Sequence, residues 1–135
     1  MFTILSHTND VSLRIVSKNR QDLFKDSLRA LAEVLKKNSS TSSGTQVVAQ
    51  IEIRSLNESS LLIDFLSRAL SLSYDKKAIF MDVKFVLFEK NLCVASLVGK
   101  KTDKFDRNVK SVTHREADIS ISPAGEYETN IILSV

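Results

Sequence analysis

After about residue 78 of this chain of 135 residues, apolar residues no longer recur at helical spacing. Before that point, two segments repeat apolar residues every three or four positions, which is the period of an α-helix with one buried face. From Ile79 onward, apolar and polar residues alternate, which is the period of a half-buried β-strand. The pattern therefore predicts two helices in the first part of the chain and about five strands with short connections after them.

Each predicted helix begins at an asparagine that can cap its first turn. Asn19 precedes Asp22 by three residues, and Asn57 lies just before the second apolar stripe. An asparagine side chain at this position accepts a hydrogen bond from a free backbone N–H of the first turn. We expect both stripes to face the core. They consist of Leu23, Phe24, Leu28, Leu31, Ala32 and Leu35, and of Leu61, Leu62, Phe65, Leu66, Ala69 and Leu70.

Strands are predicted on both sides of the second helix. Glu89-Lys90-Asn91 offers a hairpin turn, so the strands before and after it should pair antiparallel. In the first of these two strands, Ile79, Met81, Val83, Phe85 and Leu87 should share one face. The complete set of expected strands starts at Val11, spans 47–53, 79–87, 92–98, a segment around 110–113 and 117–122, and ends with 127–135.

The order of these elements favours an α+β fold in which two helices cover one face of a mainly antiparallel sheet. A doubly wound nucleotide-binding fold is disfavoured, because strand-helix alternation stops after residue 78 and no glycine fingerprint accompanies the first helix. With 135 residues, 43% of them hydrophobic, the chain can build a core without disulfides or metal. We expect one domain that covers residues 1–135.

Cys93 is the single cysteine and lies in the apolar run 92–98, so it should be a small core residue in a reducing compartment. Nothing near it in sequence supplies a base that would activate it as a nucleophile. No stretch resembles a secretory signal or approaches the ~20 apolar residues needed to span a bilayer. We therefore expect a cytoplasmic protein that does not contact membranes.

Positive charge is in slight excess, with a formal net charge of +3 and a pI of about 9.1. The most charged segment runs from Lys100 to Lys110, where Lys104 and Arg107 are interleaved with acidic residues and the aromatic Phe105. Two interpretations remain open for this segment. It is either a solvated connection or a loop that contacts RNA or protein.

Polar residues with ligand atoms cluster just before the first strand, in the segment Ser6 to Arg14. His7, Thr8 and Asp10 can each offer a hydrogen-bonding or metal-ligating atom, and the apolar alternation begins at once with Val11. An aspartate near a turn more often caps its own backbone than binds a metal. This cluster is therefore either a set of caps for the local backbone or a site that binds a metal or a partner.

The same cluster resembles the opening signature of the archease family, which is His-Thr-Ala-Asp followed by a strand. His7, Thr8 and Asp10 match it, whereas Asn9 replaces the alanine. The resemblance extends over nearly the whole chain, through both predicted helices and the closing strand. A second archease signature, Lys-Ala-Val-Thr-Tyr-His, is matched in part by Lys110, Val112 and Thr113, with His114 and Arg115 at the positions of its tyrosine and histidine.

The resemblance implies a non-catalytic activator of the RNA ligase that joins tRNA halves, acting on guanylylation and turnover of that enzyme. A chaperone-like modulator of a tRNA methyltransferase is the alternative within the family, and tRNA itself would be contacted indirectly or weakly. We expect the partner to be contacted by matched signature residues and by the basic segment. These are His7, Lys104, Arg107, Lys110 and Thr113.

The resemblance also implies a calcium-type site, formed in the family by the signature aspartate and a penultimate aspartate. Asp10 retains the first ligand, but Ser134 stands at the second position, with the Val135 carboxylate as a partial substitute. Ca²⁺ takes ~6 to 8 oxygen ligands, among which carboxylates dominate. We therefore expect Ca²⁺ binding to be weak or lost.

An enzyme is the competing functional class, but the sequence contains few of the residue patterns that catalytic or metal sites need. The chain has two histidines and neither His-Glu-x-x-His nor Cys-x-x-Cys spacing. A small basic RNA-binding module is the third alternative, supported by the mild positive charge and the segment from Lys100 to Lys110.

Overall fold

The computed structural model of the chain describes residues 1–39, 44–113 and 118–135. Its elements are β1 (Phe2–Ser6), β2 (Asp10–Ser17), α1 (Arg20–Leu35), β3 (Gln46–Arg54), α2 (Glu58–Lys76), β4 (Ala78–Phe88), β5 (Leu92–Lys101), β6 (Ser111–Thr113), β7 (Ser120–Ile121) and β8 (Tyr127–Ser134). The strands form two antiparallel sheets, one in the order β1-β2-β8-β6 with β7 paired to β8, and one in the order β3-β5-β4.

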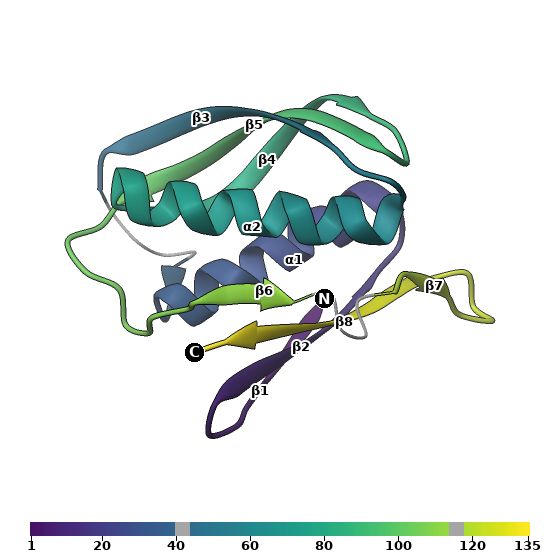
Figure 1. The fold of residues 1–135 in the computed structure, drawn as a ribbon, viewed down its shortest axis with the longest axis horizontal. Coiled ribbons are helices and arrows are strands. Elements are labelled where there is room, and N and C mark those ends of the chain that lie inside the picture. The colour runs from purple at the N-terminus through teal and green to yellow at the C-terminus, as the bar shows by residue number, and fades with distance from the viewer. Residues whose placement is uncertain (40–43, 114–117) are drawn as a thin grey trace.

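Both helices lie between the two sheets, as Figure 1 shows. Helix α1 contacts β2 of the larger sheet and β4 of the smaller one, and α2 likewise contacts β6 and β4. The α+β class with two helices is confirmed, and the strands are distributed over two sheets where we expected one. A two-residue period identifies a strand but not its partner, because pairing depends on contacts between distant segments.

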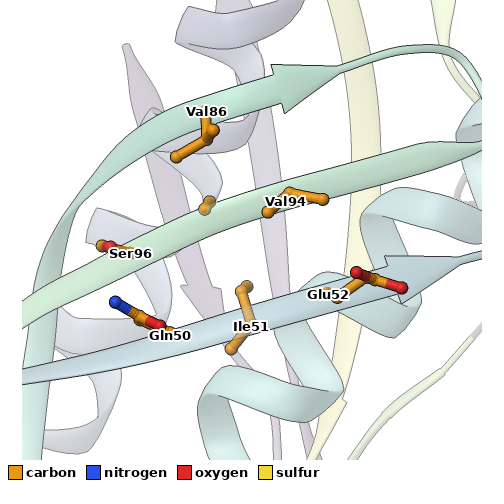
Figure 2. A pocket seen from close by; sticks show the side chains of 7 residues that line it. Gln50, Ile51, Glu52, Val86, Val94 and Ser96 are labelled. Atoms are coloured by element: carbon orange, nitrogen blue, oxygen red, sulfur yellow. The ribbon is translucent and has the colours of Figure 1, made fainter.

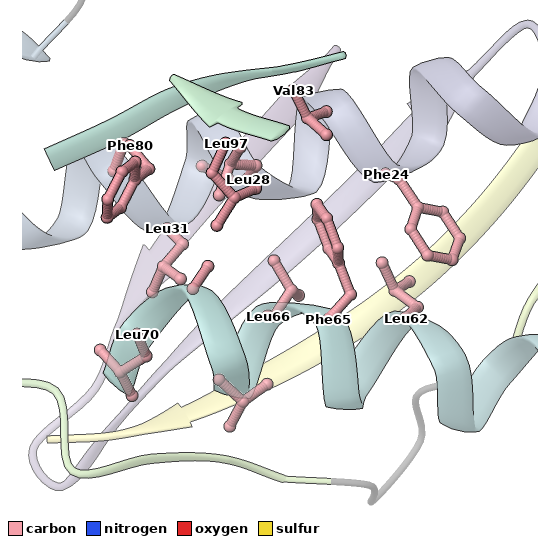
Figure 3. Close-up of a cluster of buried hydrophobic side chains, with 14 of the residues drawn as sticks. Phe24, Leu28, Leu31, Leu62, Phe65, Leu66, Leu70, Phe80, Val83 and Leu97 are labelled. Atoms are coloured by element: carbon pink, nitrogen blue, oxygen red, sulfur yellow. The ribbon is translucent and has the colours of Figure 1, made fainter. Parts of the chain in front are cut away.

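The helix caps and apolar stripes are as expected. The Asn19 side chain accepts a hydrogen bond from the backbone N–H of Asp22 at 2.8 Å, and Asn57 does the same for Ser60 at 2.9 Å. Figure 3 shows the stripes of both helices meeting below β4 and β5. Phe24 and Phe65 pack against each other in this core, with ring centroids 5.3 Å apart.

Three details differ from the expected strands. Strand β1 was not predicted, and its pairing with β2 turns the segment between Ser6 and Asp10 into a hairpin connection. Strand β4 carries irregularities between Phe80 and Asp82 and between Phe85 and Leu87. Such bulges reverse the alternation of side chains, so Leu87 is 42% exposed and Phe88 packs against Phe24 instead.

The strand expected over residues 117–122 is the third difference. Within the described residues it is reduced to the two-residue β7, and Ile121 is exposed rather than facing the core. Separately, none of the helices in the described ranges is long and apolar enough to cross a membrane.

Candidate partner-binding and metal-ligating site

Two polar residues from opposite ends of the chain face each other at the end of the larger sheet. Strand β2 pairs antiparallel with β8 in a register that sets Asp10 against Ser134, and the next pair is Val11 with Leu133. Both residues of that second pair are fully buried. Because directly opposed residues of an antiparallel pair point to the same face, the Asp10 and Ser134 side chains lie on one side of the sheet.

Backbone hydrogen bonds enclose this pair on several sides. The N–H of His7 donates to the Asp10 carbonyl at 2.9 Å and closes the β1–β2 hairpin, while the N–H of Val135 donates to the Asn9 carbonyl at 3.3 Å. From the other side, the N–H of Lys110 donates to the Ser134 carbonyl at 2.7 Å. The hairpin, the last strand and the loop before β6 therefore meet at this point.

Side chains hold the basic loop against the same region. The Arg107 guanidinium donates to the Ser6 hydroxyl at 3.2 Å, next to His7 in the hairpin. Farther along the loop, the Tyr74 hydroxyl of α2 accepts from the Val109 N–H at 2.7 Å and donates to the Val109 carbonyl at 2.9 Å. These contacts fix the loop between the end of α2 and the β1–β2 hairpin.

Six of the residues expected to ligate metal or contact a partner are brought together here, namely His7, Asp10, Arg107, Lys110, Ser134 and Val135. Thr113 lies farther along β6, opposite Ile132, and its buried hydroxyl has no hydrogen-bond partner among the described residues. Lys104 is exposed at the start of the loop, where its carbonyl accepts from Thr102. His114 and Arg115 lie outside the described residues.

The site supplies few of the carboxylate oxygens that a hard cation prefers. Asp10 is the one acidic side chain of the pair, and Ser134 adds a neutral hydroxyl. The carbonyl oxygens of Asn9, Asp10 and Ser134 already accept backbone N–H groups. Within the described residues, no group of three or more His, Cys, Asp or Glu is placed to hold a metal ion. Ca²⁺ prefers ~6 to 8 oxygen ligands, among which carboxylates dominate, and the pair of Asp10 and Ser134 supplies one carboxylate side chain.

The single cysteine of the chain, Cys93, lies in the core. Cys93 is fully buried on the inner face of β5, and burial raises the pKa of its thiol to about 11. At neutral pH such a thiol stays protonated, which makes it a poor nucleophile. The position agrees with the expected role of Cys93 as a core residue.

A second surface feature lies on the outer face of the smaller sheet. A hollow of about 330 Å³ lies over β3, β5 and β4. Figure 2 shows Gln50, Glu52, Val86 and Ser96, which are among the residues that line it. Its one ionisable residue, Glu52, pairs with Arg54 at 3.6 Å. This hollow offers no combination of nucleophile, base and acid, and it is separate from the Asp10 site.

Sequence reasoning missed two contributors to the site. Strand β1 provides the Ser6 hydroxyl that accepts a hydrogen bond from Arg107. Tyr74 anchors the loop through its hydrogen bond to Val109. The alternation of Phe2 and Ile4, both half-buried, is a short signal for β1. Tyr74 carries no such signal, because its partner is 35 residues away in the chain.

Comparison with known proteins matches nearly the whole chain to one family. Residues 2–135 match the model described as "Archease protein family (MTH1598/TM1083)". The archease of Methanosarcina barkeri (strain Fusaro / DSM 804) is 24% identical over 142 residues, covering 99% of this chain and 95% of that protein.

Two solved structures have a similar fold. The solution structure of Methanobacterium thermoautotrophicum protein 1598 has a TM-score of 0.73 at 20% identity, over 99% of this chain and 98% of that one. The crystal structure of an archease and possible chaperone from Thermotoga maritima (TM1083) has a TM-score of 0.69 at 14% identity, over 100% of this chain and 98% of that one. With a family model that spans almost every residue, the chain belongs to the archease family.

Proposed function

We propose that this archease is a non-catalytic accessory protein of a tRNA-splicing RNA ligase in the cytoplasm, and that it promotes guanylylation and multiple turnover of that enzyme. Membership in the family supports the proposal, together with the match of His7, Thr8 and Asp10 to the family's opening signature. An accessory protein of this kind works by binding one conformation of its partner more tightly than another, which shifts the populations of the two.

The observation that carries the proposal is the meeting of signature and basic residues at one exposed corner. Asp10 and Ser134 are held by the core of the larger sheet, while Arg107 and Lys110 are placed beside them by hydrogen bonds to Ser6 and Ser134. A corner of charged residues that strand pairing and hydrogen bonds hold in place suits recognition of a partner surface, because pre-organisation lowers the cost of ordering when a complex forms.

The direct test is a tRNA ligation assay with the cognate ligase, GTP and a divalent metal. We expect the protein to increase both the rate of ligase guanylylation and the number of turnovers, and to show no ligase or nuclease activity when it is assayed alone. Ligase rates that are unchanged by a stoichiometric excess of the protein would exclude the proposal.

The second candidate is a chaperone-like modulator of a tRNA methyltransferase. It is favoured by one specific observation, which is that the similar Thermotoga maritima protein is described as a possible chaperone. Light scattering during thermal aggregation of the methyltransferase, with and without this protein, distinguishes the two. Suppressed aggregation without any effect on the ligase would favour the second candidate.

A further inference from the structure

Three basic segments that are far apart in sequence meet where both helices end. Helix α1 ends before Lys36 and Lys37, and helix α2 ends at Lys76 with Lys77 as its C-cap. The basic segment from Lys100 to Lys110 comprises the last two residues of β5 and the connection after it. In Figure 1 the two helices end on the same side of the molecule, and the connection from β5 to β6 runs past both. We call the basic residues of these segments the basic end. They are Lys36, Lys37, Lys76, Lys77, Lys100, Lys101, Lys104, Arg107 and Lys110.

Hydrogen bonds fix the three segments to one another. The Lys36 ammonium donates to the Thr102 hydroxyl at 2.8 Å, and the Thr102 N–H donates to the Lys77 carbonyl at 2.9 Å. The Lys101 ammonium donates to the Lys76 carbonyl at 3.0 Å, and the Asp106 N–H donates to the Leu35 carbonyl at 2.8 Å. These hydrogen bonds therefore hold the three basic segments together where the two helices end.

Charge is distributed unevenly between this surface and the rest of the protein. Residues 33–39, 75–77 and 100–110 carry nine basic and four acidic side chains, whereas the rest of the chain carries ten basic and twelve acidic ones. The net charge of +3 is therefore the sum of a strongly positive basic end and a slightly negative remainder of the chain. Such asymmetry produces a local positive potential that the overall charge does not reveal.

The acidic residues nearby do not cancel this charge by ion pairing. The Asp106 carboxylate accepts the Lys37 backbone N–H at 2.8 Å, and the Glu33 carboxylate accepts the Asn38 N–H at 2.9 Å. Over the described ranges 1–39, 44–113 and 118–135, every ion pair that the structure contains lies between residues outside the basic end. The ammonium groups of Lys36 and Lys101 donate to neutral oxygens, so their positive charge remains.

Stabilisation of helix ends explains only part of this surface. Cations near a helix C-terminus interact favourably with its macrodipole, but the effect falls off within the last turn. One or two lysines per helix would suffice, and Lys104, Arg107 and Lys110 belong to no helix. Nine cations in these three segments exceed what the two helix ends require.

We propose that the basic end binds the phosphate backbone of RNA. The choice of RNA as the polyanion rests on the proposed function in tRNA splicing. Phe105, the aromatic residue of the segment, packs edge-on against Tyr74 at 5.0 Å, so its ring is engaged with the protein instead of a base. Contacts made by lysine and arginine to phosphates carry no sequence information, so binding is independent of base sequence and strongly dependent on salt.

Arg107 belongs both to the basic end and to the corner around Asp10, because it contacts Ser6 of the hairpin. RNA bound along the basic end therefore lies next to the surface that we assign to the ligase. The accessory protein would hold a tRNA strand beside the enzyme that acts on it.

The test measures binding of a fluorescently labelled tRNA transcript to the protein alone, by anisotropy over a series of potassium chloride concentrations. The test variant is Lys37→Glu/Lys77→Glu, which alters two exposed lysines at the ends of α1 and α2. The matched control is Lys18→Glu/Lys84→Glu, which makes the same change in net charge at two exposed lysines away from the basic end. A Lys37→Gln/Lys77→Gln variant and thermal melting check that the fold is retained.

We expect the unmodified protein to bind with an affinity that falls steeply with salt. Each lost phosphate contact lowers the slope of log K against log salt by about 1, so the test variant should lose about 2 from that slope and the control almost nothing. If the slope of log K against log salt fell equally in the test variant and the control, the proposal would be overturned, since net charge alone would then explain binding.

Two further outcomes also overturn it. Absence of RNA binding at low salt, with ligase stimulation intact, would remove the basic end as an RNA site and leave the proposed function standing. Loss of ligase binding in the test variant, with unchanged RNA affinity, would show that the basic end docks on an acidic protein surface instead.

A different result would separate the two proposals. If the unmodified protein bound RNA but did not stimulate the ligase, the proposed function would be rejected and the RNA site retained.

Discussion

Asp10 lies directly opposite Ser134 in the antiparallel pairing of β2 with β8, one residue beyond the fully buried pair of Val11 and Leu133. Directly opposed residues in such a pair have Cβ atoms about 4.5–5.5 Å apart. The core therefore fixes both the spacing and the common face of the two side chains. A second carboxylate at position 134 would stand where a shared cation could bridge it to Asp10.

Ser134→Asp is expected to create or strengthen a calcium site. In EDTA the two opposed carboxylates should repel each other and lower the free energy of unfolding by about 0.2–1 kcal/mol. Added Ca²⁺ should reverse this loss, because a ligand that binds only the folded state stabilises it. Calorimetric titration and thermal melting, with and without Ca²⁺, measure both effects.

The unmodified protein should show no tight calcium site in the same titration. Asp10→Ala introduced into the Ser134→Asp chain should abolish binding, whereas Ser120→Asp, on the exposed strand β7, should leave it unchanged. Tight binding by the unmodified chain that survives Asp10→Ala would show that a cation is held by other residues.

Charge reversal of Lys104, Arg107 and Lys110 together should slow association with the ligase. Charges at the rim of an interface act mainly on the association rate, and each exposed contact contributes little alone. The variant should remain folded, since none of the three side chains is buried. Stopped-flow association at several salt concentrations tests this, with Lys18, Lys84 and Lys90 reversed as the matched control. An unchanged rate with unchanged salt dependence would identify the loop as solvated.

Tyr74→Phe should loosen the loop that leads into β6. The change removes two hydrogen bonds to the buried backbone of Val109 and leaves its N–H and carbonyl without that partner. Such a loss typically costs about 1–3 kcal/mol. Urea denaturation should report the loss, and faster amide exchange at Val109 should locate it. Tyr127→Phe is the control, and equal stability of the two variants would argue against the anchor.

Cys93 should make stability depend on pH in the alkaline range. Its thiol has a pKa raised to about 11 by burial, whereas the unfolded chain loses the proton near 9. As pH rises from 9 to 11, the unfolded state gains a thiolate that the folded state resists, so the free energy of unfolding falls. The slope is up to about 1.4 kcal/mol per pH unit.

The comparison with Cys93→Ala isolates that slope from the titration of lysines and tyrosines. Below pH 9 the difference in stability between the two proteins should be constant, and it should shrink above pH 9. Parallel stability curves through pH 11 would contradict burial as the cause.

Local patterns in the sequence determined the helices. Asn19 and Asn57 cap α1 and α2 as expected, because a cap needs only backbone N–H groups two or three residues ahead. The apolar stripes are buried for a similar reason, since the 3.6-residue period decides by itself which residues share a face. The hairpin of β4 and β5 was also predictable, because one short turn joins the two strands.

The resemblance of His7, Thr8 and Asp10 to the archease signature identified the family from the sequence, and the family match confirms it. The exposure of Leu87 and Ile121 was not predictable in the same way. A bulge inserts an extra residue into one strand of a pair, and the sequence of β4 does not show where its bulges lie. Strand β7 is too short to impose a buried face.

Tertiary structure alone decided the division into two sheets, the pairing of Asp10 with Ser134 and the assembly of the basic end. In each case the partners lie tens of residues apart, and no local preference of the chain records which segments will meet. Lys36, Lys77 and Thr102 can be read in the sequence as three unrelated polar residues. They become one surface because the helices end on the same side of a core that both sheets enclose, and packing of that core is a property of the whole chain.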